Sequence, residues 1–369
     1  MYANGESHRK LKIFLWTICV LIGFFQIWIG RNSMNPDGIS YLDMGDAYFR
    51  GDWKMATNAQ WSPLYSWIVA LGIHAFHPTP RFEFFTVHIM QFLIFLFAIF
   101  CFHFLLLEVI VWNHKQSSPR FLIFSNQVWL LIGYSLFIWS SFKLITLTNE
   151  TPDMIAVAFL YLAAGMMLRI LNGKISVVNF IFLGFFLGLG YLARAPFFPL
   201  TFVFLIIIFF AIRKTQKALA LTVAALLSFL FLSGPFIIAL SKQKGRFTVG
   251  ESGKLNYAWK VNKVPQQYIH WRGTPGFGKP EHPTRKIFDA PPVYEFATPV
   301  GGTYPPWYDP TYWYDGIQAH FNLKQEIARI IVSMRLCIDA FFHTEDKSAT
   351  YSIYGADALI VGYLILLFI

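Results

Sequence analysis

Long apolar runs separated by short polar segments dominate this chain. Several runs are nearly uncharged and are long enough to cross about 30 Å of hydrocarbon as a helix. The pattern predicts membrane-spanning helices at residues 11–30, 84–112, 121–142, 154–171, 177–194, 197–212, 218–240 and 357–369. We therefore expect an all-α polytopic membrane protein, a transmembrane helix bundle with large extracytoplasmic loops.

Two further apolar segments differ from these spans. Residues 63–76, PLYSWIVALGIHAF, are short and contain Trp67, a residue type that favours the membrane interface. Residues 326–342 are apolar at helical spacing but are interrupted by Arg329 and Arg335. Both segments predict helices that lie in the interface and do not cross the membrane.

Composition excludes a soluble domain, because 56% of the residues are hydrophobic, 14% are charged, and the mean hydropathy is +0.48. The net charge of +10 reflects membrane orientation and a basic segment at residues 242–286. No basic-aromatic recognition motif accompanies it, so nucleic acid is not an expected partner. Membrane lipids are expected partners.

Basic residues gather on one set of loops, and short basic loops face the cytoplasm. They are Arg9, Lys10, Lys12, Lys115, Arg120, Arg169, Lys174, Arg213, Lys214 and Lys217. The expected organisation is a cytoplasmic N-terminus with a first span (1–30), a first extracytoplasmic loop with interfacial helices (31–83), a helix bundle (84–240), an extracytoplasmic segment (241–356) and the start of a further span (357–369).

The first extracytoplasmic loop is rich in carboxylates and aromatic side chains: NPDGISYLDMGDAYFRGDWKMATNAQWSPLYSW, residues 35–67. Asp37 follows a proline, where it could cap a helix, act as a directed general base, or do both. Asp43 and Asp46 share one helical face and could simply be solvated. Asp52 is typical of a loop or cap residue.

This loop resembles the first-loop motif of the GT-C glycosyltransferases, in particular the bacterial dolichyl-phosphate-mannose-protein mannosyltransferase-like and aminoarabinose-transferase-like enzymes. Family members usually have an acidic residue after the first aspartate, whereas this chain has Gly38. The matching residues are Asp37, Tyr41, Gly51, Asp52, Trp53, Pro63, Leu64, Tyr65 and Trp67.

The resemblance implies a GT-C type transmembrane fold and an inverting glycosyltransferase with Asp37 as the catalytic base. Its donor would be a polyprenyl-phosphate-linked sugar, and its acceptor a lipid, glycan or protein on the extracytoplasmic side of a bacterial inner membrane. Tyr41, Trp61 and Tyr65 would line the substrate. Such a displacement requires no cofactor, and a divalent cation is optional.

Other polar residues suit this chemistry without being specific to it. Glu150 and Asp153 in TNETPDM, together with Asp43, could position the acceptor or a metal ion, but Asp153 could equally be a helix cap. Arg194 could bind the donor phosphate, since arginine pairs with phosphate in a bidentate way, or anchor a helix at the interface. Lys254 could bind the phosphate or an anionic headgroup.

Two other functions remain open from the sequence. A transporter or flippase for lipid-linked or anionic substrates would place polar residues near the bilayer midplane. Here the ionisable residues gather outside the spans, which favours surface chemistry. A non-catalytic membrane assembly subunit is the other alternative, and it would not depend on Asp37.

Overall fold

The computed structural model describes residues 2–116, 124–264, 284–290, 292–296, 309, 311 and 317–342. The chain forms two compact units. The first comprises residues 1–252 and 282–311, and the second comprises 253–281 and 312–369. The expected span at 357–369 lies outside the described residues.

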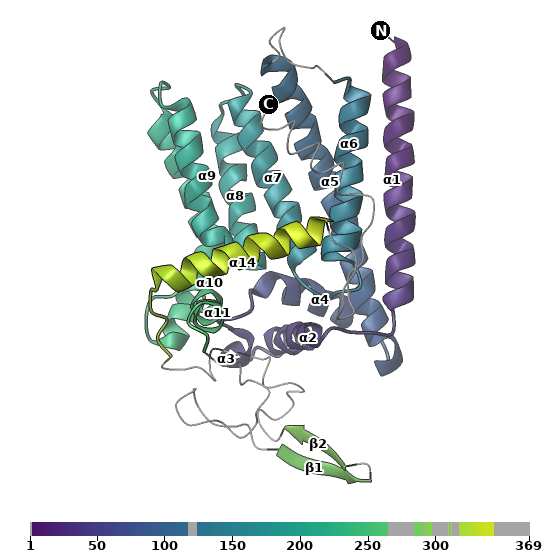
Figure 1. The fold of residues 1–369 in the computed structure, drawn as a ribbon, viewed down its shortest axis with the longest axis vertical. Coiled ribbons are helices and arrows are strands. Elements are labelled where there is room, and N and C mark those ends of the chain that lie inside the picture. Colours follow the sequence, from purple (N-terminus) through teal and green to yellow (C-terminus); the bar gives the residue numbers. More distant parts are fainter. Residues whose placement is uncertain are drawn as a thin grey trace. The chain divides into compact units, whose positions relative to one another are not determined.

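The first unit is a bundle of long helices that run side by side (Figure 1). Its members are α1 (Tyr2–Gly30), α5 (Glu83–Gln116), α6 (Asn126–Trp139, continued by the π-helix Ser140–Ile145), α7 (Asp153–Leu171), α8 (Val177–Ala193), α9 (Phe197–Ile212) and α10 (Ala218–Lys244).

Within the described part of the chain, five helices are long and apolar enough to cross a membrane: α1, α5, α6 with its extension, α7 and α10. Helices α8 and α9 are also apolar but shorter, with 17 and 16 residues. The prediction of an all-α polytopic membrane protein is confirmed.

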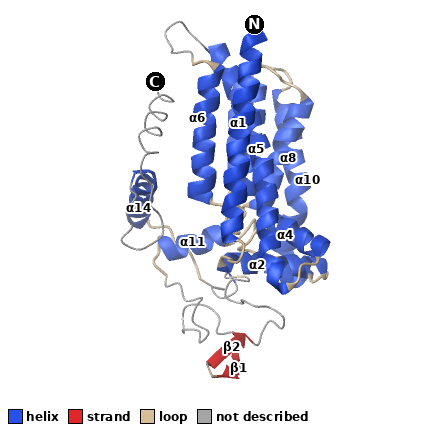
Figure 2. Ribbon diagram, turned by 90° about the vertical axis from the view of Figure 1, so that its right-hand side faces the viewer, coloured by secondary structure: helices blue, strands red, loops and turns tan. Residues whose placement is uncertain are grey.

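Three short helices lie at one end of the bundle: α2 (Pro36–Phe49), α3 (Trp53–Ala56) and α4 (Pro63–Phe76) (Figure 1; α2 and α4 also in Figure 2). Helix α4 packs against α2, α5 and α8. The segment 63–76 is therefore a helix at the foot of the bundle and not one of its long members, as its length predicted. A 3₁₀ turn, Pro80–Phe82, leads from it into α5.

The sequence explains where α2 and α3 begin, with one correction. The side chain of Asn35 caps α2 by accepting a hydrogen bond from the backbone N–H of Asp37, at 2.9 Å, and Pro36 occupies the first turn. The interpretation of Asp37 as the cap is therefore wrong, because Asn35 fills that position. Asp52 caps α3 through Met55 N–H, at 3.1 Å, as expected for a cap residue.

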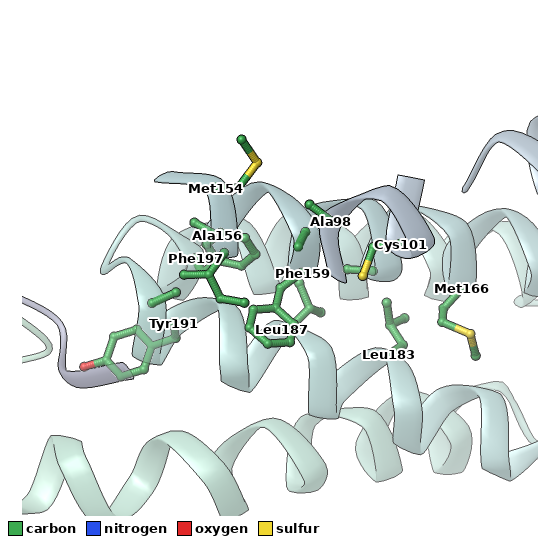
Figure 3. Packing of buried hydrophobic residues seen from close by; sticks show 14 of the residues in the cluster. Ala98, Cys101, Met154, Ala156, Phe159, Met166, Leu183, Leu187, Tyr191 and Phe197 are labelled. Atoms are coloured by element: carbon green, nitrogen blue, oxygen red, sulfur yellow. The ribbon is translucent and has the colours of Figure 1, made fainter. Parts of the chain in front are cut away.

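The core of the bundle runs between its helices, and Figure 3 shows a part of it to which α5, α7, α8 and α9 contribute. Side chains such as Cys101, Phe159 and Leu187 are buried there. Lipid tails are as apolar as these side chains, so close packing and not water exclusion holds such helices together. Gly184 of α8 illustrates this, because a Cβ at this position would overlap the backbone oxygen of Ala225 in α10.

The second unit contains most of α11 (Ser252–Lys260) and α14 (Leu323–Phe342). The Tyr257 hydroxyl donates to the Glu326 carboxylate at 3.3 Å, which joins the two helices. Helix α14 confirms the helix expected at 326–342, while its position in the interface stays a prediction. In the first unit, β1 (Thr284–Asp289) and β2 (Pro292–Phe296) form an antiparallel hairpin that the sequence did not predict.

Candidate functional site at the foot of the bundle

Three charged side chains from separate elements meet at the end of the bundle that carries α2. Asp37 lies in the first turn of α2, Asp153 begins α7, and Arg194 follows α8 as its C-cap. Arg194 Nη2 and Asp153 Oδ1 are 2.5 Å apart, and both side chains are partly exposed. The Thr151 hydroxyl donates to the other Asp153 oxygen at 2.9 Å. We call Asp37, Asp153 and Arg194 the charged cluster.

Asp37 lies close enough to Arg194 and Asp153 for both charges to affect its pKa. Burial raises the pKa of this half-buried carboxyl above the ordinary aspartate value. The positive charge of Arg194 opposes that increase, and the negative charge of Asp153 adds to it. A carboxylate whose pKa is raised towards the working pH is a better general base than an ordinary aspartate.

Aromatic side chains adjoin Asp37 on the same face of α2. Tyr41 lies one helical turn after Asp37 and is 3% exposed. Its ring packs edge-on against Trp61 and Tyr65, with centroids 5.4 and 4.9 Å away. Burial raises the pKa of the Tyr41 hydroxyl, and the negative charges of Asp37 and Asp153 raise it further while Arg194 opposes them. The three aromatics predicted to line the substrate therefore pack together, but Tyr41 and Tyr65 are buried, which leaves Trp61 as the partly exposed one.

A neighbouring loop holds Trp61 and its surroundings in place. The backbone N–H of Glu251 donates to Ala59 O at 2.8 Å, and the Tyr191 hydroxyl donates to Val249 O at 2.9 Å. Residues 249–251 thus connect the end of α8 to the segment before α4. Hydrogen bonds between these segments therefore hold the backbone on which the site is built.

Glu150 lies elsewhere than the sequence led us to expect. Its side chain is fully buried, and its Oε2 atom accepts the backbone N–H of Asn35 at 2.7 Å. Its Oε1 atom lies 3.1 Å from Nε2 of His88, which is also fully buried. Burial raises the pKa of Glu150, although the Asn35 N–H and His88 lower it. Direct contact with an acceptor would require an exposed carboxylate, whereas the carboxylate of Glu150 is fully buried.

Gly38 is explained by the same packing. A Cβ at position 38 would lie 2.9 Å from Met34 Cγ and 3.0 Å from Glu150 Cβ. A side chain at position 38, such as the acidic one in the family motif, would therefore require Met34 and Glu150 to shift.

One predicted residue lies off this face of α2, and another belongs to the second unit. Asp43 is six positions after Asp37, which places it about 120° around α2. Lys254 lies on α11 in the second unit. Their predicted roles, acceptor positioning and phosphate binding, stay predictions.

Sequence reasoning missed His88 and Asn35. His88 is a polar residue near the start of a long apolar helix, and ionisable residues in such helices often have a specific task. Asn35 directly precedes a proline at the first helical position, which is a signature of a helix start. The first signal could have identified His88, and the second could have identified Asn35.

A metal site is not evident in the described part of the chain, where no group of three or more His, Cys, Asp or Glu side chains could hold an ion. The optional divalent cation stays an expectation.

Neither a protein-family model nor a curated protein sequence matches the chain. Among solved structures, the chain is similar to the crystal structure of ArnT from Cupriavidus metallidurans bound to undecaprenyl phosphate. The sequence identity is 14%, the TM-score is 0.46, and the match covers 64% of this chain and 42% of that one. The chain thus spans less than half the length of the protein it matches.

The fold defines a class, a polytopic helical membrane protein, and the charged cluster lies at one end of its bundle.

Proposed function

We propose that this chain is a GT-C type inverting glycosyltransferase that moves a sugar from a polyprenyl-phosphate donor to an acceptor. The observation that carries the proposal is the charged cluster, in which the Arg194–Asp153 ion pair lies close enough to the half-buried Asp37 carboxyl to affect its pKa. Two further features support it. The first-loop motif around Asp37 resembles that of the family, and the partly exposed Trp61 packs against Tyr41, where its ring would pack against a sugar.

The reaction is a single displacement. An acceptor hydroxyl gives its proton to Asp37 as its oxygen attacks the anomeric carbon. The bond between that carbon and the phosphate oxygen breaks on the opposite side, and polyprenyl phosphate leaves with the bonding electrons. Attack from one side and departure from the other invert the configuration at carbon.

Arg194 stabilises the leaving phosphate. Its guanidinium has five N–H donors, so it can bind phosphate oxygens while it keeps one bond to Asp153. The partly exposed ion pair with Asp153 contributes little to stability, about 0–1 kcal/mol, so its geometry is better explained by orientation of the guanidinium. Asp153 would also orient the acceptor.

The charged cluster would face away from the cytoplasm. Consecutive helices alternate in direction, so the turns that carry the basic residues lie at the end of the bundle opposite α2. Because short basic loops face the cytoplasm, the end of the bundle that carries α2 would face away from it. The membrane would be a bacterial inner membrane. The basic residues are Lys115, Arg169, Lys174, Arg213, Lys214 and Lys217.

The test is transfer by purified protein in nanodiscs with a panel of polyprenyl-phosphate sugars. Asp37→Asn should reduce turnover by about 10²–10⁴-fold, the usual contribution of a general base. Arg194→Ala should raise the KM for the donor. Asp46→Asn is the matched control, because Asp46 lies on the same helix but pairs with Arg50. Undiminished turnover by the Asp37 variant would contradict the assignment of the base.

A further inference from the structure

A group of polar side chains is buried behind α2 and has no place in the reaction described above. His88, Gln91, Glu150 and Tyr65 are each 0% exposed. Buried polar groups are costly unless they are hydrogen-bonded, so such a group requires a reason. The contacts of Glu150 supply one.

The carboxylate of Glu150 joins three separate segments. One oxygen accepts the Asn35 N–H at 2.7 Å, in the link between α1 and α2. The other lies 3.1 Å from His88 Nε2 of α5, and the same nitrogen lies 3.0 Å from Ser33 O. A carbonyl oxygen can only accept, so Nε2 carries a proton and donates it to Ser33 O, with the Glu150 carboxylate beside the same nitrogen.

The next contacts lead directly to the proposed base. Asn35, held by Glu150 at its N–H, accepts from Asp37 N–H through its side chain at 2.9 Å and from Gly38 N–H through its carbonyl at 2.8 Å. Position 38 also packs against Glu150 itself. The carboxylate of Glu150 is thus two hydrogen bonds away from the backbone of Asp37.

We propose that Glu150, supported by His88, is a positioning residue that holds the first turn of α2, and with it Asp37, near Arg194 and Asp153. Glu150 acts through Asn35 and does not contact substrate. A carboxylate suits this task because one oxygen accepts the Asn35 N–H as a charge-assisted bond while the other lies against the His88 imidazole. The effect on the reaction rests on the proposed function, whereas the order of α2 does not.

The chain offers a matched control in Glu108. Glu108 is also a buried carboxylate, and it lies on α5 at the end of the helix opposite His88. It accepts from Arg169 at 2.9 Å and from Asn172 at 3.2 Å. Its loss should disturb the fold by a similar amount without reaching α2.

The first measurement is hydrogen exchange of the full chain in nanodiscs, read by mass spectrometry on a peptide covering residues 34–42. Glu150→Ala should speed exchange there by about tenfold or more, the weight of one hydrogen bond to a charged group. Glu150→Gln keeps one accepting oxygen and should show a smaller increase, and it replaces the alanine variant if that variant does not fold. Glu108→Ala should leave this peptide as in the wild type. Unchanged exchange at 34–42 in a folded Glu150 variant would overturn the proposal.

The second measurement is steady-state transfer. Misplacement of the base should lower kcat by about 100-fold in Glu150→Ala, because small displacements of a reacting group have effects of that size. The donor KM should stay within about twofold, since an interaction used only in the transition state affects kcat and not binding. A raised KM with unchanged kcat would contradict positioning and indicate a direct substrate contact. If the wild type transfers nothing while exchange still rises in the variant, the proposed function fails and the positioning of α2 by Glu150 stands.

Discussion

The crossing of α8 and α10 allows a sharp test of how this bundle is held together. Gly184 and Gly188 lie on the side of α8 that meets α10, in the small-xxx-small spacing that lets membrane helices approach closely. The backbone carbonyl group of Ala225 and the side chain of Ser228 lie directly against Gly184, with Ala225 C at 2.8 Å and Ser228 Cβ at 3.0 Å from the position a Cβ would take. The Ser228 hydroxyl also donates to Ile181 O of α8 at 2.8 Å.

Gly184→Ala should therefore force the two helices apart. Overpacking of this kind costs about 1–3 kcal/mol, with the high end expected where the obstacle is backbone. Separation also strains the Ser228 bond, and an interhelical bond in a membrane protein is worth about 0.6 kcal/mol. Against this, alanine gains about 1 kcal/mol over glycine in helix propensity. The net loss in the free energy of unfolding should be about 0.6–2.6 kcal/mol after these effects are combined.

The matched control is Gly234→Ala in α10. A Cβ at Gly234 would have no neighbour within 4 Å among the described residues, so only the helix-propensity gain should appear. Both variants would be unfolded reversibly by SDS in mixed micelles and followed by tryptophan fluorescence. Equal stabilities for the two alanine variants would refute the close-packing argument.

Two further predictions concern the first turn of α2. Arg194 lowers the pKa of Asp37 and Asp153 raises it. The acid limb of the kcat/KM profile should therefore move to higher pH in Arg194→Gln and to lower pH in Asp153→Asn. Shifts in the opposite directions would exclude Asp37 as the titrating base. Asn35→Ala should cost about 1 kcal/mol in unfolding free energy through loss of the cap, whereas Asn35→Ser keeps a capping oxygen and should lose much less. Equal losses in the two Asn35 variants would contradict the capping role.

Much of the fold was predictable because its elements are defined by local patterns. The expected span 154–171 begins one residue after the observed start of α7, and the helix expected at 63–76 has the bounds of α4. A lipid-facing helix is apolar along its whole length, so its ends coincide with the return of polar residues.

The division of roles within the site was not predictable in the same way. Glu150 and Asp153 are three residues apart in one loop, and the sequence assigned them the same role. The structure turns Asp153 towards Arg194 at the surface and Glu150 towards His88 behind α2. That difference depends on how α5 packs against the loop, which is a long-range contact that no local pattern encodes. Gly38 has the same explanation, because the obstacle to a side chain there comes from Glu150.

The central claim is that Asp37 takes the acceptor proton during transfer from a polyprenyl-phosphate sugar. The most direct measurement is the polyprenyl phosphate released by the wild type, Asp37→Asn and Asp46→Asn in nanodiscs, with a membrane extract as acceptor source. The account predicts release by the wild type and by the Asp46 variant, and release at least about 10²-fold slower by the Asp37 variant. Equal release by all three proteins would contradict Asp37 as the base, and no release from any donor by a folded wild type would contradict the glycosyltransferase itself.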